Sequence, residues 1–452
     1  MKQNGRITRR QFVAGAAAGV AGFHILPARA RGAAGRAGAN ERLNIAGIGV
    51  GGQGWGNLRQ FGNENIVALC DVDDQRAGEA YRTHPDAKHY RDFRQMFDQM
   101  EDQIDAVVVS TPDHTHAVAV MGALERRKHV YCEKPLAHSV GQVRALMAAA
   151  EASGVVTQLG NQGNSSGSIR TFCEWIWDGA IGNVHEVHAA CNAFPDVYSQ
   201  LRHAGRGGEE HEVPQHLDWD LWLGPAAARA YNPMYVPWNW RGWLPFGMGC
   251  IGDWICHVVD PVFWALDLGA PQSVQAEVEG YDPEEHADLY PPGAAVTFEF
   301  PARGERGPVK LVWYDGRMRP PHPADLEADR NPPGTGAIVL GDQGTITYGS
   351  HGAGGVRIVP EAKMQEYEPP EPTIPRVPGH HADWLLAIRE GRPAGSPFHY
   401  GGPLTELGLL GVIAIRFADH KLEWDAEAMR FTNCDAANQW VAPPPREGWE
   451  WA

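Results

Sequence analysis

Short β-branched runs alternate with amphipathic stretches from Arg42 to about Gly160, and this alternation constrains the fold more than any other feature of the chain. Strands are expected at Leu43–Gly49, Ile66–Asp71, Ile104–Ser110, His129–Glu133 and Val155–Gly160. Helical patterns lie between them, at residues 53–61, 74–81, 93–100, 114–127 and 140–152. Strands that alternate with helices are typical of a parallel sheet covered on both faces. The first part of the chain is therefore predicted to be a doubly wound α/β domain.

The pattern changes after about Gln162. Alternating segments predict half-buried strands of a large, mostly antiparallel open sheet, at residues 184–191, 273–280, 294–300 and 309–314. Helices predicted at residues 253–266, 381–390 and 404–419 are expected to cover one face of that sheet. A length of 452 residues also favours two domains. We predict a signal peptide and linker over residues 1–40, a nucleotide-binding domain over 41–161, and an α+β substrate-binding and oligomerisation domain over 162–452.

The N-terminal segment differs from the rest of the chain in composition. Lys2, Arg6 and the pair Arg9-Arg10 precede a weakly apolar run, Phe12 to Leu26, and Ala28-Arg29-Ala30 supplies small residues for cleavage. The pattern is similar to a twin-arginine signal, which addresses folded proteins to a dedicated translocon. We expect export to the periplasm; the alternative is a helix of the mature fold. No later segment has the roughly 20 uninterrupted apolar residues that a membrane span requires.

The net charge limits the classes of partner, and the cysteine content limits the kinds of structural site. The net charge of -16 disfavours nucleic acid and anionic membranes as partners, and a small neutral substrate fits better. The seven cysteines are scattered and include no CxxC pair, so the sequence predicts neither a disulfide framework nor a structural zinc site.

A glycine-rich turn marks the predicted nucleotide site. Gly47, Gly49 and Gly52 follow the first predicted strand and open a helix, which lets the backbone approach a pyrophosphate, as in Rossmann domains. Asp71 ends the next strand, 22 residues after Gly49, where an acid is expected to accept hydrogen bonds from a ribose. Acidic neighbours favour NAD over NADP, although Arg76 leaves NADP possible.

The next two predicted strands end in polar motifs. Thr111, Pro112 and His116 follow the third, and their segment is expected to line the cofactor cleft. Two histidines, His114 and His116, without a matching acid or thiol cluster do not indicate a metal, so none is predicted. The fourth strand ends at Glu133-Lys134-Pro135. A lysine partly desolvated beside a nicotinamide ring can have a lowered pKa and help to move a hydroxyl proton, so Lys134 is the leading catalytic candidate.

Together these motifs resemble the glucose-fructose oxidoreductase, inositol dehydrogenase and rhizopine-catabolism (Gfo/Idh/MocA) family. The resemblance covers nearly all of the chain after the signal, and Glu133-Lys134-Pro135 is its most specific motif. It implies NAD(P)-dependent oxidation or reduction of a secondary alcohol or ketone in a sugar, cyclitol or glycoside. It also implies cofactor contacts at the residues listed above, including Glu133 and Lys134.

A further motif, Gly252 to His257, is similar to an Asp and His of the same family one helical turn apart. Residues i and i+4 share a helix face, so Asp253 and His257 are expected to point into one cleft. We predict His257 as general base, Asp253 as the partner that orients its ring, and Lys134 as the residue that polarises the oxygen. The alternative is a buried pair that merely fixes the helix. Relatives divide proton transfer between this histidine, or a tyrosine in its place, and the lysine.

Substrate contacts are predicted at Gln162, Trp240 and Arg241, although Gln162 has an equal reading as a turn residue. Because free nicotinamide cofactor is scarce outside the cytoplasm, an exported enzyme is expected to carry its NAD tightly bound and to recycle it in place. One alternative is an oxidative glycosidase that acts through a 3-keto intermediate. Another is a non-catalytic sugar or NAD sensor. A homo-oligomer is also expected.

Overall fold

The computed structural model describes residues 42–206, 209–418 and 420–450. The predicted signal peptide lies outside these residues. Apart from residues 42–43 and Asn63–Asn65, the described residues form one compact unit, and the account below concerns that unit. None of the helices within the described ranges combines the length and the hydropathy that crossing a bilayer requires.

The first sheet has six parallel strands in the order β3-β2-β1-β4-β5-β6. The strands are β1 (Asn44–Ile48), β2 (Asn65–Cys70), β3 (Lys88–Tyr90), β4 (Ala106–Val109), β5 (His129–Cys132) and β6 (Thr157–Leu159). Five of them match predicted strands within a few residues, whereas β3 was not predicted, because its three residues include two exposed polar side chains. The predicted doubly wound parallel sheet is confirmed.

The helices of this part are α2 (Gln53–Leu58), α3 (Asp74–Thr83), α4 (Phe93–Met100), α5 (Asp113–Glu125) and α6 (Val140–Ser153). Side chains cap three of them: Asp73, Asp92 and Ser139 accept hydrogen bonds from backbone N–H groups in the first turns of α3, α4 and α6. Helix α5 is buried along most of its length. The polar segments that follow β1, β2, β4 and β5 therefore lie at the carboxyl edge of one sheet.

The second sheet has nine strands in the order β13-β12-β11-β7-β10-β9-β8-β14-β15. Neighbouring strands of this sheet run antiparallel except β7 with β10. The strands are β7 (Val184–Cys191), β8 (Ser273–Val278), β9 (Gly293–Phe300), β10 (Val309–Gly316), β11 (Thr335–Gly341), β12 (Thr345–Gly349), β13 (Gly354–Val359), β14 (Leu422–Asp425) and β15 (Arg430–Phe431). The prediction of a mostly antiparallel open sheet is confirmed, and β11 to β15 extend it beyond the four predicted strands.

The remaining helices are α7 (Gly167–Trp177), α8 (Pro195–Tyr198), α9 (Trp219–Leu223), α10 (Gly249–Val258), α11 (Asp260–Ala265), α12 (Glu361–Glu366), α13 (His380–Glu390), α14 (Phe398–Arg416) and α15 (Asp435–Asn438). The single helix predicted at residues 253–266 is wrong: Pro261 has no N–H to donate, and the chain divides at Val259 into α10 and α11. Helix α14 begins six residues earlier than predicted and contains Pro403.

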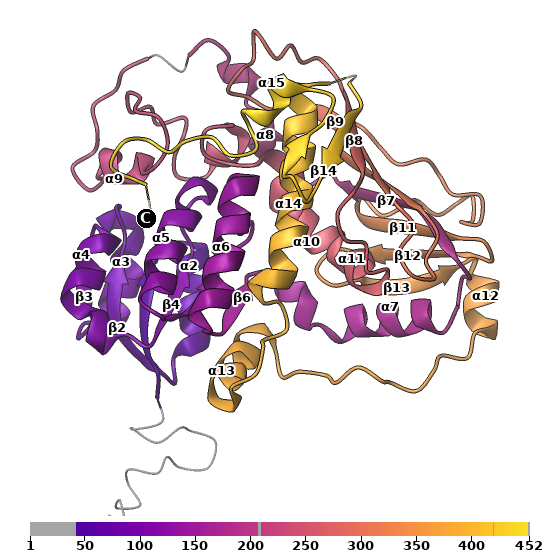
Figure 1. Ribbon diagram of the computed structural model, residues 1–452, viewed down its shortest axis with the longest axis horizontal. Helices are drawn as coiled ribbons and strands as arrows, with labels where there is room; N and C mark the ends of the chain where they lie inside the picture. The colour runs from indigo at the N-terminus through magenta and orange to yellow at the C-terminus, as the bar shows by residue number, and fades with distance from the viewer. Residues whose placement is uncertain (1–41, 207–208, 419, 451–452) are drawn as a thin grey trace, which may run out of the picture. The chain divides into compact units, whose positions relative to one another are not determined.

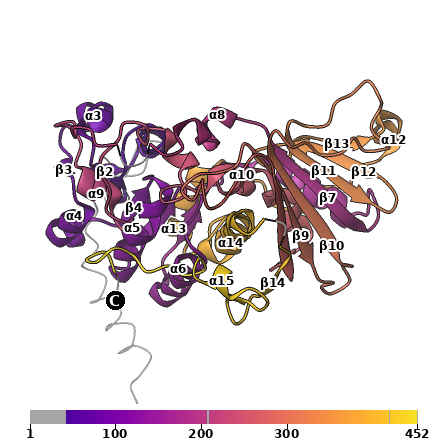
Figure 2. The ribbon, with the colours of Figure 1, turned by 90° about the horizontal axis from the view of Figure 1, so that it is seen from above.

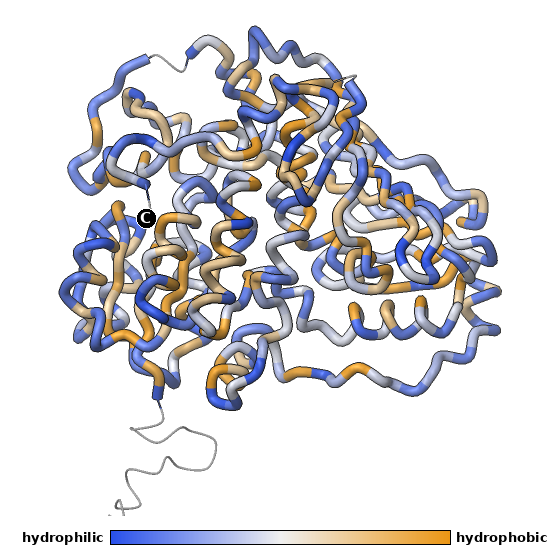
Figure 3. Tube along the Cα trace, in the orientation of Figure 1, coloured by the Kyte–Doolittle hydropathy of each residue, from blue (hydrophilic) through white to orange (hydrophobic). Residues whose placement is uncertain are grey.

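Helix α14 joins the two sheets. It packs against α6, α10 and strand β8, and Figures 1 and 2 show it between the parallel sheet and the larger sheet. Arg144 of α6 forms an ion pair with Glu406 of α14, 2.6 Å between the charged atoms. One continuous apolar core runs from β1 and β4 through α14 to β9 and β10. In Figure 3 the hydrophobic stretches follow the strands and helices that meet in this interior, and the outer loops are mostly hydrophilic.

Candidate active site

A cavity of about 590 Å³ lies at the carboxyl edge of the parallel sheet. Its walls come from the glycine-rich turn, the ends of β2, β4 and β5, helix α10, and the loops at residues 194–198, 217–241 and 351. Of the predicted site residues, the following line it: Gly49, Gly52, Asp71, Thr111, Pro112, Glu133, Lys134, Gln162, Trp240, Arg241, Asp253 and His257. Gly47 and His116 are not among the lining residues.

The glycine-rich turn fits a closely approaching ligand. Gly49 has φ +74°, and a Cβ there would lie 2.8 Å from the carbonyl carbon of Ser110 and from the backbone nitrogen of Thr111. Gly52 has φ +55°, so an L side chain is strained there as well. Gly47 has a different role, because a Cβ would meet Val50 at 2.8 Å, inside the packing of β1 on α2. The turn is thus shaped by glycine at the point where a pyrophosphate is expected.

Asp71 joins this turn to the end of β2. Its Oδ2 accepts hydrogen bonds from the backbone N–H groups of Val50 and Gly51, at 2.8 and 3.1 Å, and its Oδ1 accepts one from Asp73 at 3.0 Å. Burial raises the pKa of Asp71 to about 6, against the lowering effect of these bonds. The carboxylate lies in the cavity wall beside Arg76, where a ribose is expected.

The motif after β4 supports the cleft in two ways. Thr111 and Pro112 lie in the cavity wall, and the hydroxyl of Thr111 is buried without a hydrogen-bond partner in the described structure. His116 was predicted as a cofactor-binding residue of this segment, but it is not among the residues that line the cavity. Its two ring nitrogens lie 2.6 and 2.8 Å from the carbonyl oxygens of Pro135 and Thr111. His116 therefore ties the segment after β4 to the segment after β5.

The ring of His114 also contacts backbone carbonyl groups. Its ring nitrogens lie 3.2 and 2.9 Å from the carbonyl oxygens of Phe246 and Trp222. Both rings of the predicted histidine pair thus hold loops around the cavity. Within residues 42–206, 209–418 and 420–450, no group of three or more His, Cys, Asp or Glu residues is arranged to hold a metal ion.

Glu133 is a buried acceptor for amide groups. Its Oε1 accepts hydrogen bonds from the side chains of Asn57 at 2.9 Å, Gln162 at 3.0 Å and Gln53 at 3.3 Å. Burial raises the pKa of Glu133, although the neighbouring Lys134 and these amides oppose the change. These hydrogen bonds fix the floor of the cavity beneath Lys134. They also hold the amide of Gln162 in the cavity wall.

Lys134 and Asp253 form a buried ion pair across the cavity. The ammonium donates to Oδ1 of Asp253 and, at 3.1 Å, to its backbone carbonyl. The two side chains are only 14% and 10% exposed. Burial lowers the pKa of Lys134, but the charges of Asp253 and Glu133 and the hydrogen bond to Asp253 together outweigh it, and the pKa lies above its ordinary value. The expectation of a lowered lysine pKa is therefore wrong, because the sequence did not reveal this carboxylate partner.

Asp253 has three cationic or hydroxyl neighbours and no bond to His257. Its Oδ2 accepts a hydrogen bond from Tyr198 and lies 3.5 Å from Nε of Arg241. Burial would raise its pKa, but Lys134 and Arg241 hold the pKa below the ordinary value. The prediction that Asp253 orients the ring of His257 is thus wrong: the two share a helix face, but the carboxylate turns to Lys134.

His257 has a different neighbour, His351. The two imidazoles stack with centroids 4.2 Å apart and planes at 20°, and the backbone N–H of His351 donates to the carbonyl of His257 at 2.9 Å. The Nδ1 atom of His257 is buried and has no hydrogen-bond partner in the described structure. Burial, and then the charge of Lys134, lower the pKa of His257 well below its ordinary value. Its imidazole is therefore neutral at neutral pH.

Aromatic side chains form the wall opposite the sheet edge. The guanidinium of Arg241 lies 4.0 Å from the ring centroid of Trp238 and 4.2 Å from that of Trp240, so it is held between them. Phe194 meets Trp238 edge to face at 6.5 Å. Phe194 is 55% exposed and Trp238 is 46% exposed, although both line the cavity. The predicted substrate residues Trp240 and Arg241 thus adjoin an exposed aromatic rim, which consists of Phe194 and Trp238.

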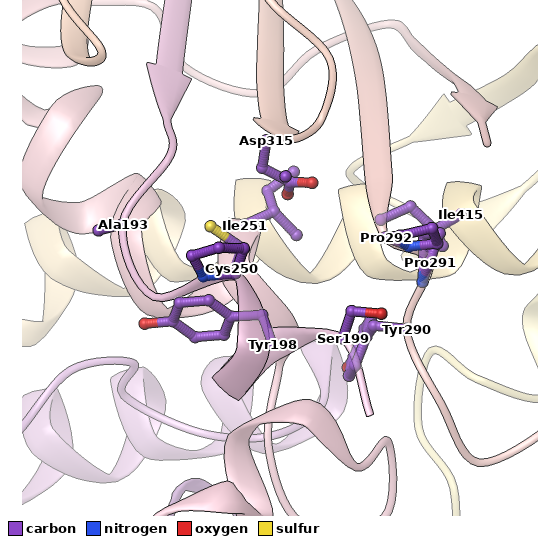
Figure 4. Close-up of a pocket in the computed structure, with 12 residues that line it drawn as sticks. Ala193, Tyr198, Ser199, Cys250, Ile251, Tyr290, Pro291, Pro292, Asp315 and Ile415 are labelled. Atoms are coloured by element: carbon purple, nitrogen blue, oxygen red, sulfur yellow. The ribbon is translucent and has the colours of Figure 1, made fainter. Parts of the chain in front are cut away.

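Sequence reasoning missed Tyr198, His351 and Phe194. Tyr198 also accepts a hydrogen bond from the indole of Trp254 at 2.7 Å. It separates the main cavity from a second one of about 20 Å³, which Figure 4 shows with Cys250 and Asp315. That space holds about one water molecule, so the second cavity is no binding site for a larger ligand. All three missed residues lie in loops or short helices where no local pattern marks a function.

Two domain models of one known family match the two parts of the chain. Residues 42–161 match the Gfo/Idh/MocA model described as an oxidoreductase family with an NAD-binding Rossmann fold, and residues 199–300 match the C-terminal α/β domain of the same family. Inositol 2-dehydrogenase from Rubrobacter xylanophilus is 35% identical over 118 residues, 25% of this chain and 33% of that protein. Levoglucosan dehydrogenase from Pseudarthrobacter phenanthrenivorans is 24% identical over 287 residues, 62% of this chain and 64% of that protein.

Solved structures share the fold. The aldose-aldose oxidoreductase from Caulobacter crescentus has a TM-score of 0.55 at 17% identity, with 85% of this chain and 100% of that chain covered. The WlbA dehydrogenase from Bordetella pertussis, in complex with NADH and UDP-GlcNAcA, has a TM-score of 0.55 at 15% identity, with 85% and 99% covered. The chain spans half or less of the length of some curated relatives that it matches, for example 33% and 50% of two inositol 2-dehydrogenases.

The residues present fit a bound dinucleotide. Gly49 and Gly52 leave no room for a Cβ or adopt positive φ, and the acid at the end of β2 and the orphaned hydroxyl of Thr111 offer polar contacts in the same cavity. Both family models and the shared two-sheet architecture agree with this geometry. Residues 42–161 therefore match the NAD-binding Rossmann domain of the Gfo/Idh/MocA oxidoreductases, residues 199–300 match the C-terminal domain of the same family, and the chain is similar to this family in both parts.

Proposed function

We propose that this protein is an NAD(P)-dependent oxidoreductase that acts on a secondary alcohol or ketone of a sugar, cyclitol or glycoside, with a tightly bound cofactor recycled in place. One observation carries the proposal: Lys134, from the end of β5, and His257, from α10, line the same cavity as the glycine-rich turn. The names of the matched relatives, which include inositol and levoglucosan dehydrogenases, support a carbohydrate or cyclitol as the substrate class.

The charges divide the proton chemistry between the two residues. Lys134 has a raised pKa, so it stays protonated and serves as a hydrogen-bond donor to the substrate oxygen. His257 has a lowered pKa, so its neutral ring is free to accept the hydroxyl proton. Asp253 and Tyr198 hold the ammonium in place. A bound NAD would supply the hydride acceptor for oxidation of the substrate carbon and, once reduced, the hydride donor for the reverse step.

The test begins with the purified protein and no added nucleotide. Native mass spectrometry is expected to show one dinucleotide for each chain, released only on denaturation. A panel of sugars, cyclitols and glycosides is then followed by product analysis. Lys134→Met is expected to abolish turnover with the nucleotide still bound. Lys310→Met, which removes an exposed lysine paired with Glu186 on the second sheet, is the matched control. Turnover by Lys134→Met at the control rate contradicts the mechanism.

The exposed aromatic rim favours a second candidate function, an NAD-dependent oxidative glycosidase. Phe194 and Trp238 offer apolar ring faces beyond the reacting centre, where a second sugar ring or an aglycone would stack. Oxidation at C3 would acidify the neighbouring C2–H, loss of that proton would expel the group at C1, and addition of water with return of the hydride would leave NAD unchanged.

Product analysis separates the candidate functions. The oxidoreductase yields a keto sugar, and the glycosidase yields a freed aglycone or monosaccharide. Phe194→Ala is expected to raise KM for a glycoside and to leave KM for the matching monosaccharide unchanged. Trp177→Ala, which removes an exposed tryptophan outside the cavity, is the control. A protein that binds NAD and sugar but turns over no member of the panel would instead be a sensor.

We further propose that the chain is exported folded through the twin-arginine translocon and acts in the periplasm as a homo-oligomer. The motif around Arg9 and Arg10 supports export. Within the described residues, the large apolar side chains that are exposed are Trp177, Phe194, Val213 and Trp238; none of them belongs to the second sheet, so they do not mark a subunit interface there and the assembly state stays a prediction. Cell fractionation of the wild type and of an Arg9→Lys, Arg10→Lys double variant tests export, and light scattering gives the assembly state.

A further inference from the structure

One end of the main cavity lies far from the reacting centre. Phe93 follows β3 and begins α4, whereas Lys134 follows β5, and both residues line the cavity. The sheet order places four strand spacings between β3 and β5, which is roughly 19 Å at about 4.8 Å for each spacing. Asp71, at the end of β2, lies on the side of Phe93. A ligand that reaches from Lys134 past Asp71 would therefore end beside Phe93.

The walls at this end are flat and apolar. Phe93, Leu217, Leu221 and Trp449 contribute side chains to the cavity lining. Trp449 is only 7% exposed, and its ring centroid lies 6.2 Å from that of Phe93. The guanidinium of Arg94 lies 4.3 Å from the Trp449 centroid and helps to fix the ring. Aromatic and apolar surfaces of this kind suit the faces of a planar base.

Two chain segments close this end of the cavity. The first, residues 214–224, lies against the chain that follows β2. Leu217 forms an antiparallel bridge with Asp73, the N–H of Asp74 donates to the carbonyl of His216 at 3.0 Å, and the N–H of Asp218 donates to the carbonyl of Val72 at 2.9 Å. These bonds hold the segment directly beyond Asp71.

The second segment is the C-terminal one, residues 446–450, which runs back to α9 beside α4 and α5 (Figure 1). Arg446 ties it to the first segment. Its side chain donates to the carbonyl of Gly224 at 2.9 Å and to the carboxylate of Asp220 at 2.6 Å, and its backbone N–H donates to the carbonyl of Pro225 at 2.9 Å. The ring of Trp449 thus reaches the cavity from a segment that the first segment anchors.

In a Rossmann domain the adenine end of the dinucleotide lies beyond the acid that binds the ribose, so this end of the cavity is where the base is expected. We propose that residues 214–224 and 446–450 retain the nucleotide by closing over this base, with Phe93 and Trp449 against it. The inference rests on the proposed function, since it requires NAD as the ligand. It explains how a cofactor would be kept without a covalent bond. Release requires the bonds of Arg446 and the backbone pairing at Leu217 to open.

The test measures the release of NADH from the purified protein after mixing with excess unlabelled NAD, by the fluorescence of the bound nicotinamide. Stacking of a base on an aromatic side chain is worth enough that Trp449→Ala is expected to speed release roughly tenfold or more. Trp449→Phe is expected to restore most of the retention. Trp440→Ala is the matched control, because Trp440 also lies under an arginine, Arg416 at 3.7 Å, but does not line the cavity.

A second measurement separates loss of the adenine contact from loss of folding. In nucleotide-free protein, Trp449→Ala is expected to weaken the binding of ADP-ribose by a similar factor. The affinity for nicotinamide mononucleotide, which has no adenine, is expected to stay unchanged. Arg446→Ala, which cuts the tie without touching the base, must also speed release. Equal release rates in the wild type, Trp449→Ala and Arg446→Ala would overturn the inference while the proposed cofactor stands. A wild-type protein that binds no NAD would overturn both.

Discussion

Removal of the Asp253 carboxylate tests the assignment of acid and base most directly. Asp253→Asn keeps the shape of the side chain and removes the charge that keeps Lys134 protonated. The pair is largely buried, so an effective dielectric constant of about 20 is appropriate, and two unit charges about 4 Å apart then interact by about 4 kcal/mol. At about 1.4 kcal/mol for each factor of ten, the neutral fraction of Lys134 is expected to rise roughly a thousandfold near neutral pH. Arg241, 3.5 Å from the same carboxylate, also lowers the pKa of Lys134 and therefore favours its neutral form.

The assay is competitive labelling of amines with trace acetic anhydride, because only the neutral amine reacts. Nucleotide-free protein is labelled between pH 6 and pH 11, and the extent at Lys134 is read by peptide mass spectrometry. Asp260→Asn is the matched control: Asp260 is a buried carboxyl on the next helix that bonds Asn161, Asn164 and Tyr400. Labelling of Lys134 in Asp253→Asn that follows the wild-type pH curve would refute the electrostatic argument and leave His257 without its claim as the base.

Three further predictions concern the same cavity. Ionised Asp71 is the form that accepts from ribose hydroxyls, and its pKa is about 6, so the affinity for NAD should fall as pH drops below 6, by up to about tenfold for each pH unit, and stay level above 7; calorimetry on Asp71→Asn should show no such dependence. His257→Asn should lower kcat by roughly 10² to 10⁴ with NAD still bound, and wild-type turnover at saturating nucleotide should not decline from pH 8 to 6, because the imidazole is already neutral; a decline centred at 6.5 would contradict this. Tyr198→Phe removes a donor to the buried Asp253 and should lower the free energy of unfolding by about 1 to 2 kcal/mol; an unchanged denaturation midpoint would show that the bond is dispensable.

The sequence predicted the architecture where local patterns carry it. Strand β4 is an apolar run, β7 has an alternating pattern, and α4 has a capping aspartate and an amphipathic pattern, so their positions follow from residues close in sequence. Strand β3 and the hairpin β14–β15 are short and mixed in polarity. They exist because neighbouring strands offer backbone partners, and such long-range pairing leaves no local signal.

The candidate site divides in the same way. Lys134, His257 and the glycines belong to short motifs whose spacing is visible in the chain. The partner of each charged group is not visible. Helical spacing showed that Asp253 and His257 share a face, but only the packing of α10 against the end of β5 brings Lys134 to that carboxylate. His351 and Trp449 enter the cavity from a turn after β12 and from the C-terminal segment, and both lie more than 90 residues after His257 in the chain.

A cofactor that leaves slowly places a demand on the base. If NAD stays bound, oxidation of one substrate must be followed by reduction of another, or of the same one, at the same site and pH. The base must then return the proton it has taken. A histidine with a lowered pKa meets this demand, because its protonated form is a stronger acid than an ordinary imidazolium and gives the proton back readily. Lys134, kept charged by Asp253, donates the same hydrogen bond in both directions. The ion pair and the low histidine pKa are therefore the two properties that a reversible, retained-cofactor cycle requires of this cavity.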